Sequence, residues 1–197
     1  MDLAFDHSRI EETIDAIVTR TMRMDMTWDW PCGVAYYGVC RAYEATGQQK
    51  YLDMVRARVG KTLPEAYLYP RFMDVQGSLS ELLPSLKLCQ TENGLWRTIL
   101  DDPGSYEEIS ASCGIAAAMI DNGNPLHTKY VQRAIEGVLE NVSTEGRVLN
   151  VSGGTAVMRD REGYRNISRD WIQGWGQGLA LAFLSGVLGC GEAPEKK

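Results

Sequence analysis

The chain begins with a segment in which apolar and charged positions recur with the period of an α-helix. The apolar positions are Ile10, Ile14, Ile17, Val18 and Met22. Ser8, followed three residues later by Glu11, has the spacing of a capping box. Charged residues occupy the remaining positions, so we expect a half-exposed, outer helix over residues 8–24.

Residues 32–46 follow a different pattern, because only Arg41 and Glu44 are charged and small residues alternate with tyrosines. A helix that is apolar on nearly all sides is a buried one. Gly47 is placed to end this helix, and residues 50–59 read as a charged, amphipathic helix. The sequence thus predicts an inner helix, a glycine stop and an outer helix.

The same unit recurs later in the chain. Residues 108–121 are poor in charge and rich in alanine and serine, and Asn122-Gly123 ends them. Residues 125–141 then carry a single apolar stripe. A Lys-Tyr pair also repeats, as Lys50-Tyr51 in the first unit and Lys129-Tyr130 in the second. Repeated pairs of inner and outer helices predict a solenoid or a closed toroid.

Two further helices and one hairpin complete the expected elements. We predict an outer helix over roughly 71–89 and an inner helix over 170–188. The stretch 172–191 has few polar groups, but its glutamines and glycines favour a buried helix over a membrane span. Residues 147–159 read as a small β-hairpin that turns at Gly153-Gly154. The fold class is therefore all-α, with seven helices.

Composition narrows the possible functions. The net charge of −6 and a pI near 5.0 argue against nucleic acid as a partner. Five tryptophans and nine tyrosines suit a pocket that holds sugar rings. The five cysteines are odd in number and lack metal-ligand spacing, so we expect reduced thiols, no metal and a cytoplasmic location. No secretory signal is apparent at residues 1–13.

Three separated stretches carry a likeness to a known family. They are Trp28 to Gly38 with Ala45-Thr46-Gly47 and Lys50-Tyr51-Leu52, Gly94-Leu95-Trp96 through Tyr106 to Ser112, and Gly174 to Leu179. In this order they resemble the unsaturated rhamnogalacturonyl hydrolases, glycoside hydrolase family 105, which are related to the unsaturated glucuronyl hydrolases. The resemblance implies an (α/α)6 toroid, in which twelve helices alternate between an outer and an inner layer.

Only seven of those twelve helices are found, which indicates an incomplete toroid within a single domain, 1–197. The alternation fails once, where the outer helix 50–59 meets the outer helix 71–89. Five helices inserted there would restore it. We therefore expect that a central segment is missing, with its junction near residues 59–64, and that the open edges favour homo-oligomers.

The resemblance also implies a reaction and its requirements. In the family, an aspartic acid protonates the C4=C5 double bond of an unsaturated uronic acid and water attacks C5, without metal, nucleotide or other cofactor. That aspartate lies in a Trp-x-Asp motif on the central helices. No such motif with its following apolar run occurs in this chain. We therefore expect the chain to be inactive on the unsaturated oligosaccharides that the family hydrolyses.

Several remaining residues are candidates for the site. The aromatic walls would come from Trp28, Trp30 and Trp175, each with a core or surface position as the alternative. Arg165 and Arg169 are candidate partners for the substrate carboxylate, unless they are simply solvated. Glu107 precedes an inner helix, where it could also interact with the helix dipole. Asp29, flanked by tryptophans, is the candidate for a substitute acid.

Two other classes of function stay open. One is a non-catalytic helical remnant that acts as a carbohydrate-binding or assembly module. The other is a toroid with different chemistry, such as a sugar epimerase, which would need two histidines as acid and base. Only His7 and His127 exist, and they lie far apart in polar contexts. No membrane partner is expected for any of these readings.

Overall fold

The computed structural model describes residues 2–26, 30–59, 76–154 and 156–191, and this part of the chain is helical. Its elements are α1 (His7–Met22), α2 (Trp30–Thr46), α3 (Gln49–Val59), α4 (Gln76–Leu88), α5 (Ile109–Asp121), the 3₁₀ turn η2 (Pro125–His127), α6 (Thr128–Leu139), α7 (Arg161–Arg165) and α8 (Gly174–Gly191). The predicted all-α class is confirmed.

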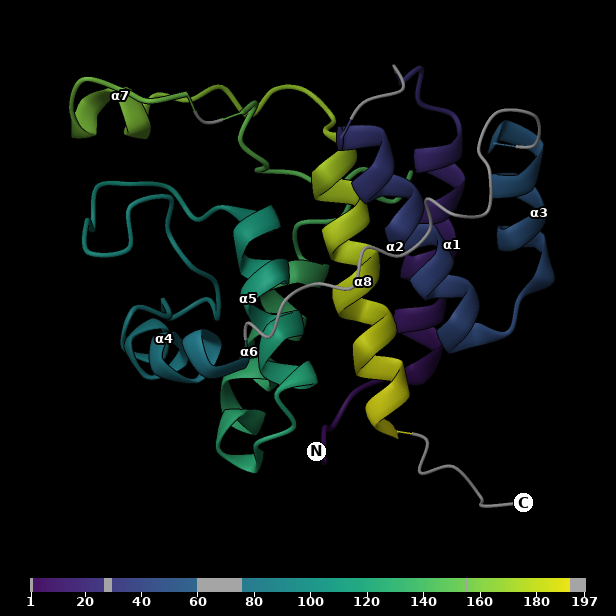
Figure 1. The fold of residues 1–197 in the computed structure, drawn as a ribbon, viewed down its shortest axis with the longest axis horizontal. Helices are drawn as coiled ribbons and strands as arrows, with labels where there is room; N and C mark the ends of the chain where they lie inside the picture. Colours follow the sequence, from purple (N-terminus) through teal and green to yellow (C-terminus); the bar gives the residue numbers. More distant parts are fainter. Residues whose placement is uncertain (1, 27–29, 60–75, 155, 192–197) are drawn as a thin grey trace.

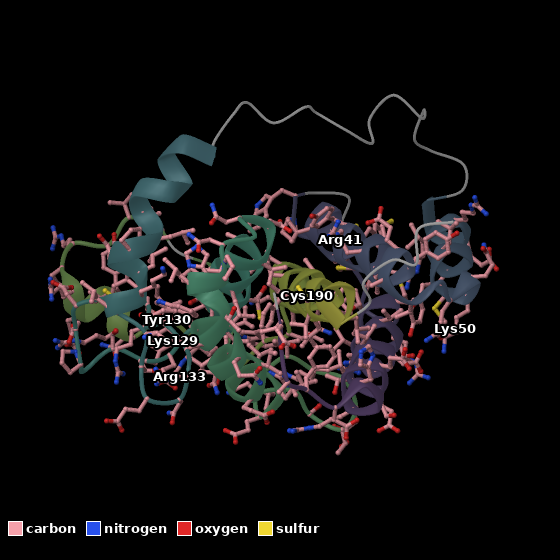
Figure 2. The ribbon with its side chains drawn as sticks, turned by 90° about the horizontal axis from the view of Figure 1, so that it is seen from below. Arg41, Lys50, Lys129, Tyr130, Arg133 and Cys190 are labelled. Carbon is pink, nitrogen blue, oxygen red and sulfur yellow. The ribbon has the colours of Figure 1, made fainter. Side chains whose placement is uncertain are left out.

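The last helix, α8, lies at the centre of the molecule, between α2 and α5 (Figure 1). It contains no charged residue, and most of its residues are buried. Viewed along α8, α5 and α2 lie on either side of it, while α6 and α1 lie below them in the view (Figure 2). Helix α3 packs on α2, and α6 packs on α5. The inner layer is thus α5–α8–α2, and the arrangement is an arc of a helical toroid.

Backbone contact between glycines sets the spacing of α2 and α8. A Cβ atom added to Gly38 would lie 2.3 Å from the carbonyl oxygen of Gly178. A Cβ atom on Gly178 would lie 2.1 Å from the carbonyl oxygen of Val34. Near the start of α8, Gly174 meets the carbonyl oxygen of Pro31 in the same way, at 2.6 Å. At these three positions no side chain larger than hydrogen fits, so the first and last inner helices touch there through their main chains.

The two helix pairs repeat in structure as well as in sequence. The Lys50 ammonium lies 5.2 Å from the ring centre of Tyr51, and the Lys129 ammonium lies 4.9 Å from that of Tyr130 (Figure 2). Tyr51 is fully buried, and its hydroxyl donates a hydrogen bond to Asp15 of α1 at 3.0 Å. Burial and the neighbouring carboxylate raise the pKa of Tyr51. The phenol therefore stays protonated and joins α3 to α1.

The predicted β-hairpin over 147–159 is wrong, because residues 147–149 pair with the residues before them in the chain. Val148 forms an antiparallel bridge with Val142, and the Leu149 N–H donates to the carbonyl oxygen of Asn141 at 2.8 Å. The reversal occurs at Gly146, whose φ is +75°. The N–H of Gly153 donates instead to the carbonyl oxygen of Ser168. The chain thus reverses at Gly146 and not, as predicted, at Gly153-Gly154.

Two element boundaries also differ from the prediction, and one short helix is new. The first helix is capped by Asp6, whose carboxylate accepts from the N–H of Arg9, so the expected capping box at Ser8 does not form. The segment 125–141 begins with the 3₁₀ turn η2 before α6 starts. The short helix α7 was not predicted. Residues 60–75, which include most of the expected junction and the start of the helix over 71–89, lie outside the described residues.

Two searches of the described residues bear on function. No helix in them is both long and apolar enough to cross a membrane. No group of three or more histidine, cysteine, aspartate or glutamate side chains in them is arranged to hold a metal ion.

The α2–α8 contact yields a stability prediction. We expect Gly178→Ala to lower the free energy of unfolding by about 1–3 kcal/mol or more, because the new methyl group overlaps the backbone of α2. The matched control is Gly189→Ala in the same helix, where a Cβ atom meets nothing within 4 Å. This control should raise stability by up to about 1 kcal/mol, since alanine is the better helix former. Urea unfolding of both variants measures the difference, and equal effects would contradict the packing.

A second prediction concerns pH. His127 is buried, and desolvation, followed by the charge of Lys87, lowers its pKa below the ordinary value of 6.5. Below about pH 6.5 the unfolded chain therefore binds more protons than the folded one, and stability falls with falling pH. We expect His127→Gln to make stability less dependent on pH in thermal melts over the range in which histidine titrates, roughly pH 5 to 7.5. The control is His7→Gln, which makes the same substitution at an exposed position.

Candidate functional site

A cavity of about 520 Å³ opens at the N-terminal ends of the three inner helices. Helix α2 contributes Trp30, α5 contributes its first turn, and α8 contributes Trp175 and Leu179. The lining residues are Trp30, Arg97, Thr98, Glu108, Ser110, Ala111, Ser152, Gly154, Tyr164, Trp175 and Leu179. Because inner helices of a toroid run in the same direction, their N-termini and the loops before them meet at one end.

Two of the predicted aromatic residues come together at this cavity. The rings of Trp30 and Trp175 stack with their centres 4.9 Å apart and their planes inclined by 23°. Trp30 is 66% exposed, while Trp175 is half-buried. The close approach of α2 and α8 causes this pairing, because both tryptophans stand at the start of their helices. An exposed apolar platform of this kind is a surface on which a flat apolar ligand face can lie.

Glu108 is the carboxylate at the floor of the cavity, and its oxygens are occupied by donors. As the N-cap of α5 it accepts from the N–H of Ala111 at 2.5 Å. The hydroxyl of Ser110 lies 2.9 Å from both oxygens, and the N–H of Ser152 donates at 2.9 Å. Glu108 is buried. It therefore fastens the loop at Ser152 to the start of α5.

Arg97 and Thr98 bring polar groups to the wall of the cavity. Arg97 donates one hydrogen bond, from Nη1 to the carbonyl oxygen of Ser105 at 2.7 Å, and forms no ion pair with the described residues. The hydroxyl of Thr98 is buried and has no hydrogen-bond partner in the described part of the chain. Both residues could thus donate to a ligand.

Of the predicted arginines, Arg169 lies near the cavity and Arg165 is held elsewhere. The guanidinium of Arg169 lies 4.1 Å from the ring centre of Tyr106, whose hydroxyl is 2.7 Å from that of the lining residue Ser152. Arg165 donates to Asp102 at 2.8 Å and to Glu162 at 3.3 Å. These hydrogen bonds raise the pKa of Arg165 and lower that of Asp102. Arg165 is thus committed to a loop ion pair.

Glu107 points to a different part of the surface. Its carboxylate accepts from the side-chain amide of Asn93 at 3.2 Å and 3.4 Å. Both residues line a separate cavity of about 510 Å³ beside the end of α4. The other two predicted residues, Trp28 and Asp29, lie outside the described residues. The structure therefore groups Trp30 with Trp175, and it does not bring Glu107 or Arg165 to them.

Sequence reasoning missed Glu108, Arg97 and Tyr164. Glu108 directly precedes the apolar run that begins at Ile109, and this position is the one that an N-cap takes. Because we predicted the helix to start one residue earlier, we assigned the position before the helix to Glu107. Arg97 lies in a loop and Tyr164 in the short helix α7, which was not predicted, and no local pattern marks a residue of this kind that reaches a distant helix.

The hydrogen bonds of Glu108 lead to a prediction with a neighbouring control. Glu108→Ala leaves one buried and one half-buried backbone N–H group and one hydroxyl without their acceptor, so we expect a loss of about 2–4 kcal/mol in unfolding free energy. Glu107→Ala, one residue away, should cost no more than about 0.5 kcal/mol. Denaturant unfolding provides the measurement. A Glu108 variant as stable as the Glu107 variant would show that the loop is held by other contacts.

Comparisons with known proteins agree on one family. The profile of the family described as Glycosyl Hydrolase Family 88 matches residues 5–67 and 54–189. The unsaturated rhamnogalacturonyl hydrolase YesR of Bacillus subtilis is 29% identical over 334 residues, which cover 94% of this chain and 97% of that protein. Because the chain has 197 residues, at least 137 of these 334 aligned positions have no residue of this chain opposite them.

Solved structures show the same likeness. A possible member of the GH105 family from Salmonella enterica serovar Paratyphi A is 27% identical, with a TM-score of 0.57 over 80% of this chain and 39% of that chain. A possible GH105 member from Klebsiella pneumoniae has a TM-score of 0.78 over 98% of this chain and 96% of that chain. At 16% identity, this second likeness concerns the fold alone, and it confirms the toroid.

The family match extends over most of the chain, in two segments that overlap at residues 54–67. The curated relative carries the activity that the sequence motifs indicated. The chain therefore belongs to glycosyl hydrolase family 88, and its relatives confirm the resemblance to the unsaturated rhamnogalacturonyl hydrolases.

Proposed function

We propose that this chain binds unsaturated uronic acid oligosaccharides, of the rhamnogalacturonyl or glucuronyl type, and does not hydrolyse them. The observation that carries the proposal is the stacked pair Trp30 and Trp175 at the mouth of the 520 Å³ cavity. The rings offer an apolar platform for the C–H face of a sugar, and the cavity is large enough for one to two sugar rings.

A cytoplasmic location, which the odd number of widely spaced cysteines favours, is part of the same proposal.

The electrostatics of the cavity suit an acidic sugar. Three helices point their N-terminal ends at it, and the partial positive charge of these ends favours an anion. Arg97 lines the wall without an ion-pair partner among the described residues, so its guanidinium is suited to the uronate carboxylate. Thr98 and Ser110 add hydroxyl groups. Arg169, stacked on Tyr106, is a candidate for a second contact with the carboxylate.

Catalysis would require a further group, because hydration of the C4=C5 bond needs an acid that donates its proton to a carbon atom. Glu108 is the sole carboxylate among the described lining residues, and four donor contacts occupy its oxygens. By resemblance, the family's aspartate belongs to central helices. The two-segment family match, the overlap at 54–67 and the unmatched positions of YesR support a junction near residues 59–64 in place of those helices.

Asp29 defines the alternative in which the chain retains activity. It is the sequence neighbour of Trp30, which lines the cavity, so an aspartic acid at this position would stand close to a bound sugar. Turnover that Asp29→Asn abolishes would establish it as a substitute acid. A helical assembly module that binds no sugar is the other alternative.

The proposal predicts binding without turnover. Calorimetric titration with an unsaturated galacturonyl–rhamnose disaccharide should give a dissociation constant that Trp30→Ala and Trp175→Ala each raise by about tenfold, because each removes half of the platform. The matched control is Trp171→Ala, at an exposed tryptophan that does not line the cavity.

The same samples give the activity readout. The ultraviolet absorbance of the C4=C5 double bond should persist on prolonged incubation with the protein. Loss of this absorbance would overturn the inactive assignment. Absence of binding, or equal loss of affinity in all three tryptophan variants, would overturn the proposed site.

A further inference from the structure

Helix α7 brings Tyr164 to the cavity, but hydrophobic packing does not hold this helix in place. It has five residues, and none of them is buried. Figure 1 shows α7 at the outer end of the long segment that joins α6 to α8. A helix of this length is not stable in isolation, because it forms too few hydrogen bonds to offset its nucleation. Polar contacts with another segment must therefore fix the position of Tyr164.

The loop between α4 and α5 supplies these contacts through two adjacent aspartates. Arg161 pairs with Asp101 at 2.7 Å, and Arg165 donates from Nε to Asp102 at 2.8 Å. The first pair is exposed on both sides, whereas the side chain of Asp102 is only 5% exposed. Exposed ion pairs contribute little to stability, and partly buried ones are screened less by salt. The pair of Arg165 with Asp102 is therefore the main attachment of α7.

The carboxylate of Asp102 is held in place by its own loop. Its Oδ1 accepts from the N–H of Gly104 at 2.9 Å, and its Oδ2 accepts from Arg165. The N–H of Asp102 donates to the carbonyl oxygen of Ile99 at 3.0 Å. Its carbonyl oxygen accepts from the N–H of Ser105, also at 3.0 Å. Arg165 thus has a partner whose position does not depend on α7.

The same loop brings Arg97 and Thr98 to the cavity wall. At the base of the loop, the N–H of Thr98 donates to the carbonyl oxygen of Tyr106 at 2.9 Å. Arg97 donates from Nη1 to the carbonyl oxygen of Ser105 at 2.7 Å. One hydrogen-bonded loop therefore presents two polar side chains to the cavity and holds α7 at its tip. The ion pair at the tip sets where the aromatic ring of α7 stands relative to those polar groups.

The hydroxyl of Tyr164 is suited to donate to a ligand. Its oxygen accepts from the N–H of Met158 at 3.2 Å, and its proton has no acceptor in the described part of the chain. The backbone at Met158 is close, since a Cβ atom added to Gly163 would lie 2.9 Å from the Cβ of Met158. A phenol that accepts one hydrogen bond still has its own proton to donate. The half-buried Tyr164 therefore offers the cavity both a ring and a donor.

From these contacts we infer that Tyr164 is a third aromatic residue of the sugar site, whose hydroxyl donates to an oxygen of the bound acidic sugar, and that Arg165 is the positioning residue that holds it there through Asp102. The inference rests on the proposed binding function and adds a residue that fixes the orientation of the ligand. The stacked tryptophans offer an apolar face, whereas a phenol donates in one direction. Arg165 thus serves the site without touching the sugar carboxylate.

Calorimetric titration with the unsaturated galacturonyl–rhamnose disaccharide tests the role of Tyr164. Tyr164→Phe keeps the ring and removes the donor, so the dissociation constant should rise by about fivefold, the effect of one ordinary hydrogen bond. Tyr164→Ala also removes the ring and should raise it further. Tyr37→Phe is the matched control, at an exposed tyrosine that does not line the cavity, and it should have no effect.

The role of Arg165 needs a readout that a merely structural role would not change. Arg165→Met should weaken binding at least as much as Tyr164→Phe, and Arg165→Lys, which keeps the charge, should retain most of the affinity. On a Tyr164→Ala background, Arg165→Met should add no further loss, because Arg165 acts through Tyr164. The control is Arg159→Met, at an exposed arginine of the same segment that forms no ion pair with the described residues.

Cleavage by chymotrypsin after Tyr164 reports the attachment of α7 without any ligand. Proteolysis within a helix requires local opening, so its rate follows the open population. Relative to the same bond in the unfolded chain, Arg165→Met should be cleaved about fivefold faster than the wild-type chain. Arg165→Lys and Arg159→Met should stay near the wild-type rate, and mass spectrometry of the fragments identifies the bond.

The outcomes separate this inference from the proposed function. Wild-type affinity in both Tyr164 variants or in Arg165→Met would overturn the inference and leave the proposed function intact. Additive losses in the double variant would show that Arg165 does not act through Tyr164. Unchanged cleavage in Arg165→Met would show that the ion pair does not hold α7. Absence of binding by the wild-type chain would overturn the proposed function, and the ligand role of Tyr164 with it.

Discussion

The main-chain contact between α2 and α8 is the constraint on which the rest of the molecule depends. It joins the first and last inner helices, and glycine at positions 38 and 178 is what permits it. Helix α8 is fixed against α2 on one side, and α5 packs on its opposite side. The outer helices then cover the outward faces of α2, α5 and α8. The platform of Trp30 and Trp175 follows from the same contact, because both rings stand at the entrances of the helices that it joins.

A second support comes from Glu108, which ties a loop to the start of α5. The cavity wall contains Ser152 and Gly154, which belong to no helix, and a loop alone would have many conformations. One buried carboxylate with donors from two segments removes that freedom. The cavity therefore has a rigid side built by helix packing and a second side held by hydrogen bonds.

The division that we propose between binding and catalysis has a structural basis. The aromatic platform comes from α2 and α8, and the converging helix ends come from α2, α5 and α8. By family resemblance, the acid belongs to central helices for which the sequence has no counterpart. On the proposed function, a toroid shortened in this way would keep the groups that hold a sugar and lose the proton donor.

The sequence by itself determined the long helices, their assignment to inner or outer layers and the family. These depend on local signals, because charge on a helix face decides whether it can be buried, and glycine decides where a helix ends. It did not determine which glutamate enters the cavity, since Glu107 and Glu108 differ by one residue of helix start. Nor did it show that Arg165 is committed to Asp102, or that Val148 pairs with Val142. Those choices depend on groups brought together by folding, so only the tertiary structure decided them.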